Sequence, residues 1–193
     1  RFGDQYYDPY MGEIAYVDEQ IGRLIEELAR QGLDQNTLIV LTADHGESLG
    51  QHGEATHAFF VYDTTLRVPL IFRCPGLVPC GATVDSLVRS IDIAPTILRL
   101  VGAPPLTNAQ GIDLSPAWET PEVELKLEAY SETFYTRYNL GYSQLRSLHA
   151  DGWKFILAPT PELYHLREDP AEAGGGGGGG PERVEAMRAR LRT

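Results

Sequence analysis

The sequence predicts an α/β fold, in which a mostly parallel sheet flanked by helices is followed by a small C-terminal antiparallel sheet and helix. The first observation is the apolar run at residues 37–42, which is rich in β-branched side chains and typical of a strand buried on both faces of a parallel sheet. The second is an amphipathic segment, residues 10–32, just before this run. The third is a series of short strand-like segments after residue 125.

The first helix is expected over residues 10–32. Apolar side chains recur there at helical spacing on one face, and charged side chains occupy the other faces. Gly32 stands where a left-handed residue would end the helix. A second apolar run, residues 68–72, carries Pro69 near its start, where a strand tolerates proline, and is expected to form another buried strand.

Asp92 is interpreted as the N-cap of a helix over residues 93–100. Pro95 would lie in the first turn and Gly102 just beyond the last turn, where these residue types are favoured. The pattern favours a capping role for the Asp92 carboxylate over a role as a metal ligand.

The C-terminal part of the chain is predicted to be an antiparallel meander closed by a helix. Its strands are expected at residues 128–132, 143–148 and 153–157. The tripeptide Ala-Asp-Gly at 150–152 is typical of a tight turn that joins the last two strands. An amphipathic helix is expected over 182–192. We therefore divide the chain into an α/β part, residues 1–125, and an antiparallel subdomain, residues 126–193.

Seven consecutive glycines occupy residues 174–180, whereas glycine in the rest of the chain is ordinary in amount. A natural linker, an engineered linker and a placeholder for residues of unestablished identity would all give such a run. The flanking sequence is typical of ordered structure, which favours the last two. We expect the run to carry no function.

Composition excludes several classes of protein. The 193 residues carry 16 Lys plus Arg against 27 Asp plus Glu, a formal net charge of −11, which argues against a basic nucleic-acid surface and against docking on anionic lipid. No apolar run approaches the roughly 18 residues that a membrane helix needs. The chain begins at Arg1 without a signal-peptide pattern, so we expect this residue not to be the natural N-terminus, and no compartment is predicted.

The two cysteines, Cys74 and Cys80, flank five residues in a segment rich in proline and glycine. Their spacing matches no zinc motif, because structural zinc needs four ligands. Two unpaired thiols or one incidental loop bridge are the favoured interpretations.

The segment after the first predicted strand holds the residues that suggest chemistry. In open α/β sheets ligands bind beyond the C-terminal ends of strands, and Asp44 and His45 occupy this place. A carboxylate oxygen and an imidazole nitrogen can share one divalent cation, and Gly46 allows close approach of the backbone. His52 and His57 follow, so three of the five histidines lie within residues 45–57.

Each of these residues has a simpler interpretation when it is taken alone. An isolated Asp-His pair is more often a surface or capping pair, and an isolated histidine is more often a hydrogen-bonded structural residue. The fixed order of strand, Asp-His-Gly-Glu, His-Gly and a further histidine is poorly explained by chance. The combination therefore favours a functional site.

These motifs resemble the sulfatase branch of the alkaline phosphatase superfamily, and specifically the C-terminal half of its catalytic domain. The late metal motif of the family is Asp, then Asn or His, then Gly, with Gly-x-His-Gly downstream; residues 44–46 and 50–53 match it. The family commonly has a lysine thirteen positions after the metal aspartate, where this chain has His57. Segments similar to later parts of the family domain stand at 62–71, 90–98, 154–156 and 162–172.

The resemblance implies an alkaline-phosphatase-like fold of which this chain is a partial domain, so an uncovered core should expose apolar surface. It also implies a divalent metal ion, with Ca or Mn more expected than Zn or Mg, and Asp44 and His45 as two of its ligands. His57 would neutralise charge on the transferred group or protonate the leaving group. His52 is the second candidate for this role, with a structural role in its loop as the equal alternative.

The nucleophile of the family is a formylglycine made from Cys or Ser in a Cys-x-Pro-x-Arg motif, or a Thr or Ser, well before the late metal motif. Cys74 follows that motif and directly precedes Pro75, so it does not match. The expected partner is therefore the missing N-terminal half of the same domain, which would also supply an early Asp pair to the metal. Glu47 and Glu54 are expected to orient neighbouring histidines.

The resemblance implies a hydrolase of sulfate, phosphate or phosphonate esters of small molecules, inactive as this chain alone. The alternatives are a phosphoglycerol or phosphoryl transferase of the same superfamily, and a non-catalytic fragment or pseudo-enzyme without the nucleophile. Histidines at positions 45 and 57 favour the phosphodiesterase, phosphonate hydrolase or transferase relatives over strict sulfatases.

Overall fold

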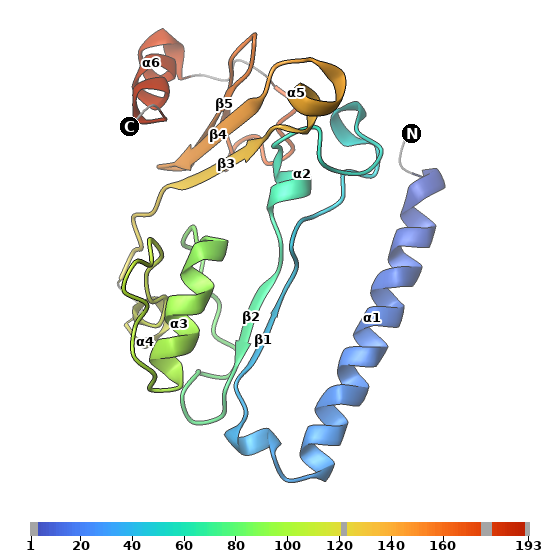
Figure 1. Cartoon of the computed structure of the whole chain (residues 1–193), viewed down its shortest axis with the longest axis vertical. Helices are drawn as coiled ribbons and strands as arrows, with labels where there is room; N and C mark the ends of the chain where they lie inside the picture. Colours follow the sequence, from blue (N-terminus) through green and yellow to red (C-terminus); the bar gives the residue numbers. More distant parts are fainter. Residues whose placement is uncertain (1–3, 121–122, 175–178, 192–193) are drawn as a thin grey trace. The chain divides into compact units, whose positions relative to one another are not determined.

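The computed structural model describes residues 4–120, 123–174 and 179–191 (Figure 1). The chain forms two compact units. The first consists of Arg1–Ala43, Pro69–Asp85 and Arg89–Glu124, and the second of Asp44–Val68, Ser86–Val88 and Leu125–Thr193. One break, after Glu124, lies beside the predicted domain boundary. The segment Asp44–Val68, however, belongs to the same unit as the residues after 125, so the predicted α/β part does not form one unit by itself.

The first unit begins with the long helix α1 (Asp4–Arg30). The predicted start at residue 10 is wrong, since the helix continues N-terminally through Pro9. A proline in the second turn removes only one intrahelical hydrogen bond, which a long helix tolerates. Gly32 has a φ of 70° and confirms the predicted left-handed end. Apolar side chains of α1, Ile14, Val17 and Leu24 among them, are exposed, as expected for a core that this chain covers only in part.

The two apolar runs form strands β1 (Ile39–Thr42) and β2 (Leu70–Arg73), after the short 3-10 helix η1 (Asp34–Asn36). The strands pair antiparallel, with Ile39 opposite Arg73, and β1 is mostly half-buried. The expectation that these strands pair in parallel and are buried on both faces is therefore not met in the described part of the chain. An apolar run reports burial but carries no information on strand direction. Cys74 and Cys80, which follow β2, are free thiols, in agreement with one of the two interpretations.

The helix predicted from Asp92 has the predicted bounds, α3 (Ile93–Leu100), and follows the 3-10 helix η3 (Ser90–Asp92). The Asp92 side chain, however, does not cap α3. Its fully buried carboxylate accepts hydrogen bonds from Arg89 Nη2 at 2.8 Å and from the backbone N–H groups of Arg89 and Ile112 at 2.9 Å. Burial alone would raise the pKa of Asp92, but the bonds from Arg89 and Ile112 outweigh it and lower the pKa. Asp92 is thus a structural ion-pair residue. The last helix of the first unit is α4 (Pro116–Glu119).

The second unit contains the predicted antiparallel meander. Its strands are β3 (Ala129–Thr133), β4 (Leu145–Ala150), β5 (Trp153–Leu157) and β6 (Glu162–His165), paired in this order. The β4–β5 turn has Asp151 and Gly152 at φ values of 54° and 76°, which confirms the predicted tight hairpin. The short helix α5 (Tyr135–Leu140) lies between β3 and β4.

Helix α6 (Gly180–Arg190) closes the second unit and begins two residues before the predicted start. Met187 packs with Leu148, Phe155 and Leu163 of the sheet in one buried apolar cluster. Most of the glycine run, residues 175–178, lies outside the described residues, so its expected lack of function stays a prediction. None of the helices in the described ranges is long and apolar enough to cross a membrane.

Candidate active site

The loop that follows β1 carries Asp44 and His45 side by side. The backbone N–H of His45 donates to Asp44 Oδ1 at 3.0 Å, which leaves Oδ2 of this carboxylate 3.7 Å from His45 Nε2. His45 Nδ1 lies 2.9 Å from the carbonyl oxygen of Gly46. Because a carbonyl only accepts, Nδ1 carries the proton in the neutral ring, and Nε2 keeps its lone pair toward Asp44.

This geometry fits two ligands of one divalent ion. Metal–ligand bonds of about 2.0–2.5 Å place two ligand atoms of the same ion about 3–4 Å apart, and the 3.7 Å separation lies in this range. Both side chains are open to solvent, with 88% of the Asp44 and 44% of the His45 side chain exposed. Among the described residues no group of three or more His, Cys, Asp or Glu side chains is arranged to hold a metal. The separation of the two atoms is thus compatible with the predicted role of Asp44 and His45 as two ligands of one ion.

His57 lies next to this pair. Its ring centroid is 4.0 Å from that of His45, with an angle of 30° between the planes. His57 Nδ1 lies 3.3 Å from Glu47 Oε2, so the carboxylate orients the ring, as expected for Glu47. The structure therefore brings together three of the four predicted site residues, Asp44, His45 and His57.

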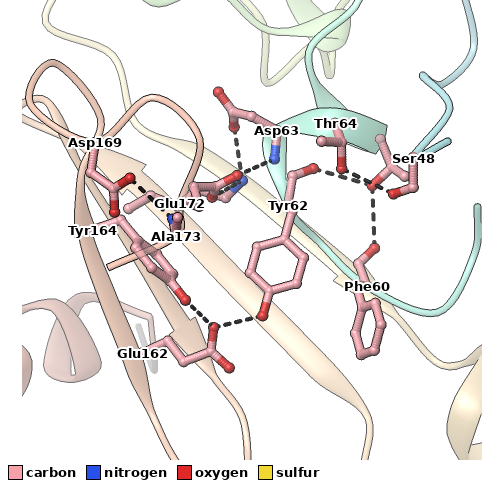
Figure 2. A network of polar contacts seen from close by, with 12 residues as sticks. Ser48, Phe60, Tyr62, Asp63, Thr64, Glu162, Tyr164, Asp169, Glu172 and Ala173 are labelled. Atoms are coloured by element: carbon pink, nitrogen blue, oxygen red, sulfur yellow. Dashed lines mark hydrogen bonds and ion pairs between the residues drawn. The ribbon is translucent and has the colours of Figure 1, made fainter. Parts of the chain in front are cut away.

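His52 makes different contacts. It lies in the 3-10 helix η2 (Gln51–Gly53) with a φ of 54°, and its ring stacks on Tyr62 at 3.6 Å between centroids. The hydroxyl of Tyr62 donates to Glu162 Oε2 at 2.8 Å, and Tyr164 donates to the same oxygen at 2.6 Å (Figure 2). Burial and the Glu162 carboxylate raise the pKa of both tyrosines, which therefore stay protonated as donors. These contacts favour the structural alternative for His52.

The loop is held in place by its backbone. The N–H of Gly46 donates to the carbonyl oxygen of Thr65 at 2.8 Å, and a Cβ at Gly46 would overlap the carbonyl oxygen of Thr64. The close approach of the backbone that Gly46 was expected to allow is therefore observed. Glu54, which was expected to orient a histidine, instead accepts from the backbone N–H of Phe59 at 2.7 Å and from the Ser48 hydroxyl. Glu54 is buried and has a local structural role, so this expectation is wrong.

The structure also contains an ion triad of Lys154, Asp63 and Glu172 that was not predicted. Lys154 of β5 is 1% exposed; its Nζ lies 2.8 Å from Asp63 Oδ1 and 2.9 Å from Glu172 Oε1. Burial raises the pKa of Glu172 against the opposing effect of Lys154. A lysine between apolar neighbours in a strand was the available signal, because such a lysine is rarely buried without a partner.

Comparison with known proteins identifies the family of this chain. The family model described as Sulfatase matches residues 1–103, which is more than half of the chain. The chain therefore belongs to the sulfatase family, within the class of α/β proteins that the sequence motifs indicated.

Among curated relatives, N-acetylglucosamine-6-O-sulfatase of Bacteroides thetaiotaomicron is 32% identical over 183 residues, covering 87% of this chain and 31% of the relative. Arylsulfatase K of Bos taurus is 29% identical over 196 residues, covering 95% of this chain and 35% of the relative. The chain thus spans about a third of the length of these relatives.

Solved structures confirm the fold. A structure described as in complex with its substrate D-glucosamine-2-N,6-O-disulfate superposes with a TM-score of 0.78 at 28% identity, covering 93% of this chain and 38% of the other. Phosphonate monoester hydrolase of Agrobacterium radiobacter gives a TM-score of 0.74 at 26% identity, covering 94% and 41%. The sulfatase-like fold and its partial representation in this chain are therefore both as predicted.

Proposed function

We propose that this chain supplies the C-terminal part of the active site of a metal-dependent hydrolase that cleaves sulfate esters of small molecules. The main observation that supports this proposal is the cluster in which Asp44 Oδ2 faces His45 Nε2 and the ring of His57 lies against His45. Relatives named as sulfatases support the sulfate ester, and the neighbour described with a sulfated glucosamine makes amino-sugar sulfates the first substrates to test.

Asp44 and His45 would hold the metal ion, Ca or Mn before Zn or Mg, together with ligands from the part of the relatives that this chain does not span. The bound metal would polarise the ester and stabilise charge on its oxygens. The Gly46 carbonyl keeps the proton of His45 on Nδ1, and His57, oriented by Glu47, would donate a hydrogen bond or a proton to the reacting group. The nucleophile is likewise expected outside this chain, because Cys74 does not match the family motif.

Phosphonate and phosphate esters are the second candidate substrates. They are favoured by histidines at positions 45 and 57, and by similarity to a phosphonate monoester hydrolase. A phosphoryl transferase and a non-catalytic fragment remain the alternative functions.

Substrate preference and metal dependence test the proposal. The full-length protein is expected to hydrolyse 4-nitrophenyl sulfate or glucosamine 6-sulfate faster than a phosphonate monoester or a phosphodiester, and to lose activity on chelation and regain it with Ca or Mn. The measurement is kcat/KM for each substrate before and after metal removal. A preference for the phosphonate would select the second candidate, transfer to glycerol without net hydrolysis would select the transferase, and no turnover of any ester would overturn the proposal.

The role of His57 is tested by its dependence on the leaving group. A His57→Ala variant is expected to lose kcat about 10²–10⁴-fold for a poor leaving group such as a sugar alcohol, because general acid catalysis contributes about this much. The loss for 4-nitrophenyl sulfate should be much smaller, since 4-nitrophenolate needs no protonation.

The same comparison separates the two roles of His57. Equal losses for both leaving groups would show that the histidine neutralises charge on the transferred group instead. Unchanged kcat for both would remove His57 from the site. His165→Ala is the matched control, because His165 also pairs with a glutamate, Glu168, at 3.4 Å but contacts none of the three clustered residues in the contacts described.

A further inference from the structure

We propose that Lys154, buried in the C-terminal sheet, is a positioning residue of the candidate active site, because it holds the short helix α2 (Asp63–Leu66), which in turn fixes the backbone beside Asp44 and His45. The inference rests on the proposed function for its catalytic consequence. It goes beyond that function by assigning a role to residues that lie outside the histidine cluster.

The first step is the ion triad at the start of α2. Lys154 Nζ contacts Asp63 Oδ1 at 2.8 Å and Glu172 Oε1 at 2.9 Å, and the backbone N–H of Asp63 donates to Glu172 Oε2 at 2.6 Å (Figure 2 shows the last of these bonds). Glu172 is itself restrained by a backbone hydrogen bond, in which its N–H donates to the Asp169 carbonyl at 3.1 Å. The first residue of α2 is therefore bound through both its side chain and its backbone.

The second step leads from α2 to the loop with the candidate ligands. The carbonyl oxygen of Thr65 accepts from the N–H of Gly46 at 2.8 Å, and the Thr64 hydroxyl lies 3.0 Å from the Ser48 hydroxyl. Thr65 and Ser48 are buried. Two successive residues of α2 thus contact positions 46 and 48, on both sides of Glu47.

The third step is the effect on His45. Its Nδ1–H donates to the carbonyl oxygen of Gly46, so the orientation of this peptide determines which ring nitrogen faces Asp44. A shift of α2 would move the backbone of Gly46, because the hydrogen bond from its N–H to the Thr65 carbonyl joins two backbone groups directly. The chain of contacts Lys154–Asp63–Thr65–Gly46–His45 consequently connects the sheet with the candidate metal ligand.

An apolar side chain would fill the position of Lys154 in β5 without the desolvation cost of a charge. What the lysine adds is directional: its ammonium group binds two carboxylates at once and restrains the carboxylate of Asp63 at the start of α2. This distinguishes positioning from packing and makes the inference testable.

The experiment compares Lys154→Met with wild type in the full-length protein. Methionine keeps the length of the side chain and removes the charge. Backbone hydrogen exchange in residues 44–50 is expected to be at least about tenfold faster, and Mn affinity measured by calorimetry about tenfold weaker, the usual size of the effect when a residue that orients a metal ligand is lost. Arg190→Met is the control, because Arg190 also binds two carboxylates, Asp151 at 2.8 Å and Glu128 at 2.7 Å, but anchors α6.

Asp63→Asn is the second variant and serves if Lys154→Met does not fold. It keeps the backbone bond of residue 63 to Glu172 and the Lys154–Glu172 pair, and weakens only the pair between Lys154 and residue 63. It should change exchange and Mn affinity in the same direction as Lys154→Met. Lower melting temperatures with unchanged local exchange and unchanged Mn affinity would overturn the inference and leave the triad with a purely structural role.

Hydrogen exchange also separates this inference from the proposed function. If the wild-type protein hydrolyses no ester but the variants still loosen residues 44–50, the proposed function fails and the contact chain stands. If the wild type is active and the variants loosen nothing in this segment, the contact chain fails and the proposed function stands.

Discussion

Replacing Asp44 with alanine in the full-length protein is expected to weaken divalent-metal binding at least about a hundredfold and to abolish measurable ester hydrolysis. The substitution removes the Oδ2 atom that faces His45 Nε2, and with it a full negative charge from the site. It also frees the backbone N–H of His45 from its bond to Oδ1. Calorimetric titration with Mn and Ca, together with kcat on the best substrate, measures both effects.

Because 88% of the Asp44 side chain is exposed, its loss should hardly change the melting temperature of the metal-free protein. Stability and metal affinity therefore separate. Asp85→Ala, at another exposed aspartate, is the matched control for the change in net charge. Unchanged metal affinity in Asp44→Ala would remove Asp44 from the site and with it the proposed half-site.

Replacing Gly46 with alanine is expected to destabilise the protein by about 1–3 kcal/mol and to weaken metal binding about tenfold. The new Cβ would overlap the carbonyl oxygen of Thr64 and lie 3.3 Å from Thr65 Cα, both of which are backbone atoms that no rotamer change can move. The loop must shift, and the 2.8 Å bond from the Gly46 N–H to the Thr65 carbonyl is strained or lost. Thermal unfolding and Mn calorimetry provide the two measurements.

Gly22→Ala is the matched control for this variant. Gly22 lies within α1, where an added Cβ meets nothing within 4 Å, so alanine should stabilise the helix by about 0.5–1 kcal/mol. The same substitution is thus expected to have opposite signs at the two positions. If the Gly46→Ala variant is as stable as wild type and binds Mn with the same affinity, the close contact does not constrain the site.

Local sequence patterns were sufficient for most individual elements. The bounds of α3 and β5 are as predicted, because a helix start with proline in its first turn and a hairpin with Asp-Gly at its turn depend on neighbouring residues. The contact between the Asp92 carboxylate and the backbone N–H of Ile112 was missed for the opposite reason. Ile112 is 20 residues away, and no pattern around Asp92 indicates this contact.

The pairing of β1 with β2 shows the same limit at the level of the sheet. The apolar runs located both strands, but their antiparallel direction depends on the path of the chain between them. That intervening segment, Asp44–Val68, belongs to the second compact unit, where it meets residues after 125. Hydrophobic pattern specifies which residues avoid water; it does not specify which distant segment covers them.

The sequence by itself determined the family and the candidate ligand pair, because Asp44, His45 and Gly46 are adjacent in the chain and their geometry is set by short-range hydrogen bonds. Only the tertiary structure decided that His57 lies against His45 while His52 stacks on Tyr62. It also placed Lys154 on Asp63, 91 residues earlier in the chain. The physical reason is burial: a charge removed from water must find a partner in space, and folding brings that partner from a distant part of the sequence.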